Sequence, residues 1–174
     1  TGYWLLARIV EEVSGESLSD FNKNLFSSAG VSTLHYTKFT QVDRQPNEVE
    51  YYGQGGEQQY VYSIAPRRDG DGGIGISAPD LLRSVCALDK LSDRLDVLQS
   101  TTIDLLRGAG PLAPNWGRGI GFWNEQNYWW TTGSLPATRS WLISRYDGTS
   151  IVMILNSKSV SASFDNDFNA LLSG

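Results

Sequence analysis

The stretch that decides the fold of this chain runs Asn127-Tyr128-Trp129-Trp130-Thr131-Thr132-Gly133-Ser134-Leu135-Pro136-Ala137-Thr138-Arg139-Ser140-Trp141. Its first part is rich in aromatic and β-branched residues, which favour a strand. The run Thr131-Thr132-Gly133 ends that strand, and Pro136 marks the turn that follows. Residues 139–141 then begin a second strand-forming run. The sequence therefore predicts two antiparallel strands joined by a short connection.

The same composition continues on both sides of this stretch. Strands are predicted over residues 117–123, 128–132, 139–146 and 149–156. Asp147-Gly148 is a dipeptide typical of tight hairpins, and residues 151–155 are apolar throughout, as expected for a strand covered on both faces. Apolar residues at helical spacing then predict a closing helix; they are Phe164, Phe168, Leu171 and Leu172.

The first part of the chain has helical periodicity instead. Helices are predicted over residues 3–14, from Leu18 to just before Gly30, from Ser77 to about Leu88, and over 96–107. Ser17 and Ser77 are the expected N-caps, and Asp80 would complete a capping box with Ser77. Residues 32–70 mix loop with short β-like pieces at 48–52 and 59–64. A connection of that length usually carries function or small elements of its own.

This order of elements predicts an α/β (α+β) fold in which an antiparallel sheet is flanked by helices. We expect residues 1–174 to form a single partial domain. Residues 1–110 would be mainly helix and loop, and residues 111–174 would supply the strands and the last helix.

Composition excludes several classes of protein. The net charge is −5, and the basic residues are scattered, so the basic stripe of a nucleic-acid binder is missing. The single cysteine, Cys86, excludes an internal disulfide and a paired-cysteine metal site, and its apolar neighbours indicate a buried small hydrophobe. No apolar run approaches the ~20 residues that span a bilayer. No metal or cofactor is expected.

Three further sequence features could indicate nucleotide binding, a catalytic triad or an N-terminal nucleophile. Residues 70–75 have the spacing of a dinucleotide-binding GxGxxG loop, but a loop-like segment precedes them instead of a strand. His35 is the only histidine that a catalytic triad could use, and we interpret it as structural because no nucleophile-elbow motif is present. Thr1 could act as an N-terminal nucleophile only at the start of a strand, whereas a helix follows it directly.

The segment around Thr131 resembles the third motif of the β-lactamase/penicillin-binding-protein superfamily, written KTG or, in the class C-like and esterase branch, HxG. The continuation Gly133-Ser134-Leu135-Pro136-Ala137-Thr138 is similar to that branch in particular. Other segments resemble the family in the same order. Residues 1–15 resemble the helix after the Tyr-x-Asn motif, 18–31 a following helix, 72–88 a glycine-led helix start, and 116–123 a strand.

The resemblance implies roles for four residues. The family's third-motif strand forms one wall of an acyl-transfer site, and the amide after the glycine donates a hydrogen bond to the developing oxyanion. Carried over by position, Ser134 and Gly133 are the catalytic positions, because the Ser134 amide would be the donor and Gly133 would leave the approach open. Thr131 and Thr132 would contact the substrate.

The chain departs from the family pattern in two ways, and these leave two hypotheses for its function. Thr131 stands at the Lys/His position, and neither Ser-x-x-Lys nor Tyr-x-Asn is present in the chain. One hypothesis is the C-terminal portion of a β-lactamase-related serine hydrolase acting on an ester, amide or lactam. The alternative is a non-catalytic relative that serves as a binding or interaction module.

The resemblance also implies partners and a compartment. A small-molecule or peptide substrate is expected, and the family would be periplasmic or secreted. In the family fold two further strands, from the N-terminal part, lie beside the strand that corresponds to residues 149–156. Without them that strand would be an open edge, so we expect it to pair with a missing N-terminal segment or to mediate self-association.

Overall fold

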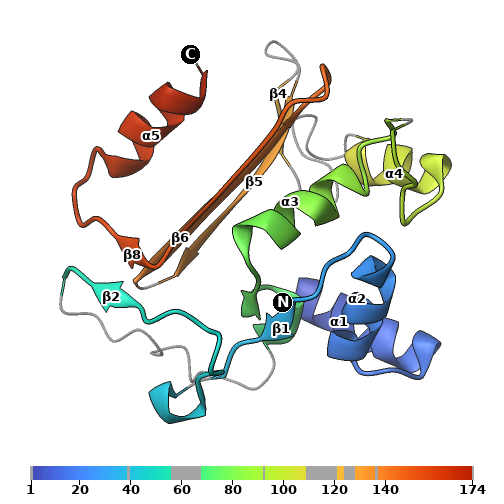
Figure 1. The fold of residues 1–174 in the computed structure, drawn as a ribbon, viewed down its shortest axis with the longest axis horizontal. Coiled ribbons are helices and arrows are strands. Elements are labelled where there is room, and N and C mark those ends of the chain that lie inside the picture. Colours follow the sequence, from blue (N-terminus) through green and yellow to red (C-terminus); the bar gives the residue numbers. More distant parts are fainter. Residues whose placement is uncertain are drawn as a thin grey trace.

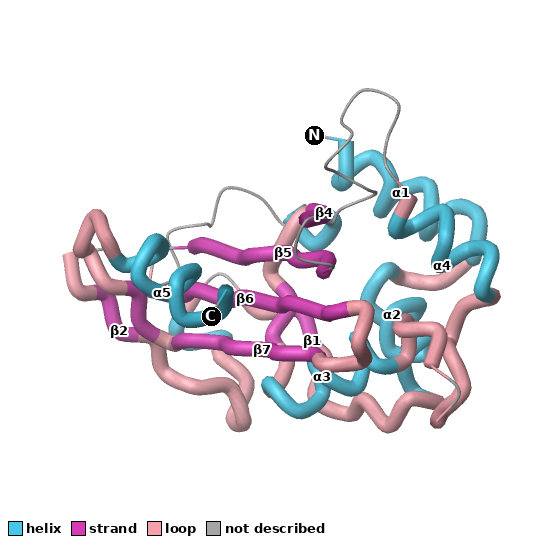
Figure 2. Tube along the Cα trace, turned by 90° about the horizontal axis from the view of Figure 1, so that it is seen from above, coloured by secondary structure: helices cyan, strands magenta, loops and turns pink. Residues whose placement is uncertain are grey.

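The computed structural model describes residues 2–38, 40–55, 68–91, 93–108, 121–123, 128–135 and 137–173. A four-stranded antiparallel sheet forms its centre, in the order β4 (Gly121–Trp123), β5 (Tyr128–Leu135), β6 (Thr138–Arg145) and β7 (Ser150–Leu155). Figure 2 shows these strands side by side in that order. The fold class predicted from the sequence is confirmed.

Helices cover both faces of the sheet. In Figure 1 the sheet is seen on edge, with α5 (Phe164–Ser173) on one side and α3 (Ala78–Cys86) on the other. Below α3 lie α1 (Gly2–Ser14) and α2 (Leu18–Ser27), which pack against each other, and α4 (Ser100–Arg107) lies beyond α3. The sheet and its two covering helices therefore form one part of the fold, and α1 and α2 form another.

The core between α3 and the sheet is built from alternate residues of the strands. Val85 of α3 packs with Trp129 of β5 and Leu142 of β6, and all three are buried. Side chains of a strand alternate between the two faces. Hence the odd-numbered residues of β5 and the even-numbered residues of β6 face α3, and the others face α5.

Smaller elements connect these layers. The short strand β1 (His35–Tyr36) pairs antiparallel with β3 (Ile74–Gly75), and β2 (Tyr52–Gly53) pairs parallel with β8 (Ser157–Lys158). Two single-turn 3-10 helices, η1 (Gln41–Asp43) and η2 (Arg68–Gly70), complete the described elements. The β2–β8 pairing brings the middle of the chain to the segment that precedes α5.

Most predicted helices and strands are confirmed with shifted ends. The strand predicted to end at Thr132 continues to Leu135, because its pairing with β6 extends to Leu135↔Thr138. The helix predicted from residue 96 begins at Ser100. The short piece predicted over 48–52 is a strand only at Tyr52–Gly53. Residues 59–64 and 117–120 lie outside the described residues.

The N-terminal caps need one correction. Ser17 and Ser77 cap α2 and α3 as predicted, each accepting a hydrogen bond from the amide three residues later. Asp80, however, does not complete a capping box with Ser77. The Ser77 amide donates to Thr33 Oγ1, and the Asp80 carboxylate accepts from the amides of Ser32 and Thr33. A contact between distant segments thus replaces the local one.

Candidate functional site

The site begins at the connection between β5 and β6. Leu135 pairs with Thr138, and only two residues separate them, so they form the closing hydrogen-bonded pair of a hairpin. Hydrogen-bonded and non-hydrogen-bonded pairs alternate along an antiparallel ladder. Ser134, opposite Arg139, therefore occupies a non-hydrogen-bonded position. Backbone groups at such a position point away from the partner strand.

On its other side, the end of β5 has no paired strand among the described residues. There β4 pairs only with the start of β5, at Tyr128, Trp129 and Trp130. Thr131–Leu135 consequently form an edge in the described part of the sheet. The Ser134 amide points toward this edge, where an extended ligand could add as a further strand.

The four residues selected from the sequence lie on this edge but do not share one face. Thr131 and Gly133 are on the α3 face, and Thr132 and Ser134 are on the α5 face. Thr131 is half-buried, whereas Thr132 and Ser134 are exposed. A ligand along the backbone edge could reach all four residues. A ligand held by side chains on one face could reach only two of them.

Gly133 is required by its neighbour on β6. A Cβ atom at this position would lie 2.5 Å from Ser140 Oγ, on the α3 face. The family resemblance assigned this glycine to ligand approach, and the structure adds a packing reason for a residue without a side chain.

Lys158 was not identified from the sequence. It belongs to β8, and its Nζ donates a hydrogen bond to Ser134 Oγ over 2.9 Å. The two residues are 24 positions apart, and no regular pattern in residues 157–163 indicates where Lys158 would lie. Lys158 is positioned by the end of β7, where Leu155 lies opposite Arg139, by the contact of β8 with β6, and by the β2–β8 pairing, which places it opposite Gly53.

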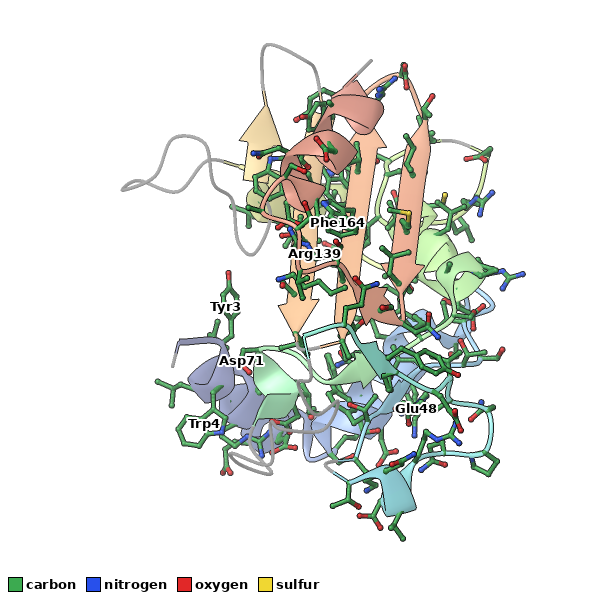
Figure 3. All side chains as sticks on the ribbon, turned by 90° about the vertical axis from the view of Figure 1, so that its left-hand side faces the viewer. Tyr3, Trp4, Glu48, Asp71, Arg139 and Phe164 are labelled. Atoms are coloured by element: carbon green, nitrogen blue, oxygen red, sulfur yellow. The ribbon has the colours of Figure 1, made fainter. Side chains whose placement is uncertain are left out.

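Arg139 organises the α5 face beside Ser134. Its Nε donates to Asp165 Oδ1 over 2.9 Å, and its Nη1 donates to the Gly133 carbonyl over 3.1 Å. The guanidinium lies over the Trp141 ring, 4.5 Å from the ring centre. Figure 3 shows Arg139 beside Phe164, which begins α5. Arg139 is only 8% exposed, and these three contacts hold its buried guanidinium in place.

A pocket opens beside this cluster, between the end of β5 and the start of α5. Its lining is polar or charged at five residues and apolar at the rest, with Ser134, Lys158, Ser159, Ser161 and Asp165 in the first group and Leu135, Val160, Ala162 and Phe164 in the second. The cavity is about 710 Å³, which is large enough for a small ligand.

The other sequence features are structural in the described part of the chain. Gly70 and Gly75 lie in η2 and β3, with no parallel strand–helix–strand unit around them. His35 Nδ1 lies 2.9 Å from the Thr33 carbonyl, and its Nε2 faces Glu48. Cys86 is half-buried, and burial raises the pKa of its thiol, which makes it less reactive. Thr1 lies outside the described residues.

The described residues contain neither a metal centre nor a membrane-spanning helix. No cluster of three or more His, Cys, Asp or Glu side chains is placed to hold a metal ion. Of the described helices, none combines the length and apolar composition needed to cross a bilayer.

Comparison with known proteins gives a fold likeness. No family model and no curated protein matches the chain. Among solved structures, a penicillin-binding protein from Bacillus halodurans is 22% identical with a TM-score of 0.73 and is matched over 98% of this chain and 54% of its own. SurE with D-Leu is 20% identical with a TM-score of 0.69, over 99% of this chain and 41% of its own.

An octameric penicillin-binding-protein homologue from Pyrococcus abyssi is 19% identical with a TM-score of 0.65, over 99% of this chain and 41% of its own. The chain thus spans about half the length of these proteins or less. The likeness does not distinguish the class C-like branch, which stays a prediction. What these structures share with the chain is its fold: an antiparallel sheet between helices, of the penicillin-binding-protein type.

Proposed function

We propose that the chain is the C-terminal portion of a serine hydrolase related to the β-lactamases and penicillin-binding proteins, acting by acyl transfer on an ester, amide or lactam. The observation that carries this proposal is the orientation of the Ser134 amide, which points to the edge of β5 and away from β6. The fold likeness to penicillin-binding proteins supports the same reading.

In this proposal β5 forms one wall of the active site. The acyl part of the substrate lies along the edge Thr131–Leu135 and pairs with its backbone. A serine from a Ser-x-x-Lys segment outside this chain gives its proton to a base of that segment and attacks the acyl carbon, and the carbonyl oxygen gains negative charge. The bond to the leaving alcohol or amine then breaks, and that group departs with the proton. The Ser134 amide donates to that oxygen, which lowers the barrier because the donor is already in place. Thr131 and Thr132 contact the substrate from opposite faces of the strand.

The experiment uses the whole polypeptide encoded by the reading frame that contains residues 1–174. A labelled fluorophosphonate or penicillin should acylate a serine in a Ser-x-x-Lys segment. Ser134→Pro removes the amide hydrogen at an edge position that tolerates proline, and Ser134→Ala is the control that keeps it. We expect the proline variant to be acylated roughly 10²–10³-fold more slowly and the alanine variant within about tenfold of wild type.

Two results would contradict the proposal. Equal rates for the proline and alanine variants would remove Ser134 from the oxyanion site. Failure of every serine to react would exclude the hydrolase and favour the non-catalytic alternative.

Thr131 is the observation that favours this second candidate, a non-catalytic binding or interaction module. A threonine neither carries the charge of the family's lysine nor relays a proton as its histidine does. In that case the edge of β5 would still bind an extended ligand, without acylation.

A further inference from the structure

We propose that the Asp71-Gly72 bond is a site of spontaneous covalent modification, at which Asp71 converts to isoaspartate through a succinimide ring. The chain contains three Asp-Gly dipeptides, which begin at Asp69, Asp71 and Asp147. In such a dipeptide the glycine has no side chain that would hinder attack by its own backbone nitrogen on the aspartate carboxyl. The dipeptide by itself gives all three the same chemistry, and their surroundings in the fold make them different.

The reaction needs no partner other than water. The Gly72 nitrogen forms a bond to Asp71 Cγ, a C–O bond of the protonated carboxyl breaks, and the hydroxyl leaves with the amide hydrogen as water. Water then opens the ring at either carbonyl. Attack at Cγ restores aspartate, whereas attack at the main-chain carbonyl leaves Gly72 bonded to Cγ and frees a main-chain carboxylate. The product is isoaspartate, which has the mass and charge of aspartate but a main chain that is one atom longer.

The two reacting groups at Asp71 are free to meet. Asp71 follows η2 at the surface, near the start of α1 (Figure 3). Its carboxylate forms no hydrogen bond or ion pair with any residue that the structure describes, and the Gly72 amide donates to no described backbone carbonyl. A Cβ atom at Gly72 would meet nothing within 4 Å, so the ring has room. Ring closure at this position therefore breaks no described contact.

Asp69 is held in place by the helix beside it. Its carboxylate accepts a hydrogen bond from Arg8 of α1 and is paired with its charge. Gly70 lies against the same helix, because a Cβ atom at this position would be 2.6 Å from the Tyr3 carbonyl oxygen. Ring closure would break the ion pair and would need space that α1 already fills. Asp69 should therefore react more slowly than Asp71.

Asp147 is exposed, but hydrogen bonds hold both of its reacting groups. Asp147 Oδ1 accepts from the Thr149 amide over 2.8 Å, and the Gly148 amide donates to the Arg145 carbonyl over 3.2 Å. The hydrogen bonds from the backbone and side chain of Thr149 also lower the pKa of the Asp147 carboxyl, which keeps it in the ionised form that closes the ring poorly. Ring closure in this hairpin would cost both hydrogen bonds, so Asp147 should also be protected.

Isomerisation at Asp71 would disturb the segment that follows it. The Gly73 carbonyl accepts from the amide and from the hydroxyl of Thr37, over 2.7 and 2.9 Å, and Ile74 then pairs with Tyr36. An additional main-chain atom before Gly73 would shift this end of the segment, while the contact of η2 with α1 fixes the other end. We therefore expect the isomerised protein to melt at a lower temperature than fresh protein.

The test follows the whole polypeptide during storage at pH 5 and pH 8, because only the protonated carboxyl closes the ring readily. Electron-transfer fragmentation of its peptides locates isoaspartate, and water enriched in heavy oxygen labels each aspartate that has passed through the ring. Isoaspartate should form at Asp71 at least about tenfold faster than at Asp69 or Asp147, and faster at pH 5 than at pH 8. In guanidinium chloride all three aspartates should react at similar rates, because unfolding removes their different surroundings.

Two variants complete the design. Asp71→Glu should remove the label at this position, because the longer side chain would have to form a larger ring. Asp147→Glu, at another exposed aspartate that precedes a glycine, is the matched control and should leave the rate at Asp71 unchanged. The proposal is overturned if Asp69 or Asp147 reacts as fast as Asp71 in the folded protein, or if Asp71 reacts only after unfolding. Equal melting temperatures of the isomerised and the fresh protein would exclude the effect on β3. Each result is independent of the proposed hydrolase, because ring closure needs no serine from another segment.

Discussion

The Asp80 carboxylate accepts hydrogen bonds from both the amide and the hydroxyl of Thr33, each over 2.7 Å. Asp80 lies in the first turn of α3 and is 1% exposed, while Thr33 belongs to the segment between α2 and β1. Ser32 and Arg83 donate to the same carboxylate. This group therefore joins the α1–α2 part of the chain to the helix that covers the sheet.

Replacing Asp80 should destabilise the fold. Asp80→Asn leaves an amide nitrogen facing backbone donors and removes the charge that Arg83 pairs with, so we expect a loss of about 2–4 kcal/mol in the free energy of unfolding. Urea denaturation measures this change. Asp71→Asn, at an exposed aspartate, is the matched control and should stay within about 0.5 kcal/mol of wild type. Equal effects of the two substitutions would contradict the role of Asp80.

The contribution of Asp80 should depend on pH. Burial acts to raise the pKa of this carboxyl, but the hydrogen bonds from Ser32, Thr33 and Arg83 outweigh burial and hold it well below the ordinary value of 3.8. A lowered pKa in the folded state stabilises the protein above the unfolded value, and this stabilisation is lost as the pH falls below it.

The difference in unfolding free energy between wild type and Asp80→Asn should therefore be constant from pH 7 to 5 and shrink below about pH 4. Denaturation at pH 7, 5 and 3.5 measures it, and the difference between the two proteins cancels the titration of the other carboxylates. If the difference instead grows as the pH falls, the pKa of Asp80 is not lowered in the folded state.

Gly70 and Gly72 should differ strongly in how well they tolerate replacement by alanine. A Cβ at Gly70 would lie 2.6 Å from the Tyr3 carbonyl and 2.9 Å from Trp4 Cα, and this backbone of α1 cannot rotate away. Gly70→Ala should thus destabilise the protein by about 3 kcal/mol. Gly72→Ala, with no atom within 4 Å of the new Cβ, should be nearly neutral in thermal denaturation. Similar melting temperatures for both variants would exclude the close approach of α1 and η2.

Arg139 and Asp165 should be coupled. Arg139→Met leaves the partly buried Asp165 carboxylate without its cation and removes a second donor from the Gly133 carbonyl, so we expect a loss of about 2–3 kcal/mol in stability. The double variant Arg139→Met/Asp165→Asn should recover about 1 kcal/mol, measured by a double-mutant cycle in urea. Strictly additive energies would show that the two side chains act independently.

Local sequence determined the elements of this protein. The enrichment in aromatic and β-branched residues from Tyr128 onward specifies strands, and Ser17 and Ser77 specify helix starts, because those signals depend only on neighbouring residues. The short connection around Pro136 also made the β5–β6 hairpin predictable, since parallel strands need a crossover connection of a dozen or more residues; that only two residues separate the strands came from the structure. The candidate site residues Thr131–Ser134, in contrast, were selected because this segment resembles the family's third motif.

Tertiary structure alone decided what surrounds that edge. Lys158 reaches Ser134 because the sheet order brings the end of β7 near the end of β5, and because β8 then contacts β6 and pairs with the distant β2; no periodic signal encodes these contacts. Local spacing likewise predicted the wrong hydrogen-bond donor for Asp80, the amide of Ser77. The carboxylate instead accepts from the amides of Ser32 and Thr33, which folding brings next to it. Local sequence determines where a residue lies within a strand, whereas its contacts with distant segments depend on how those segments pack.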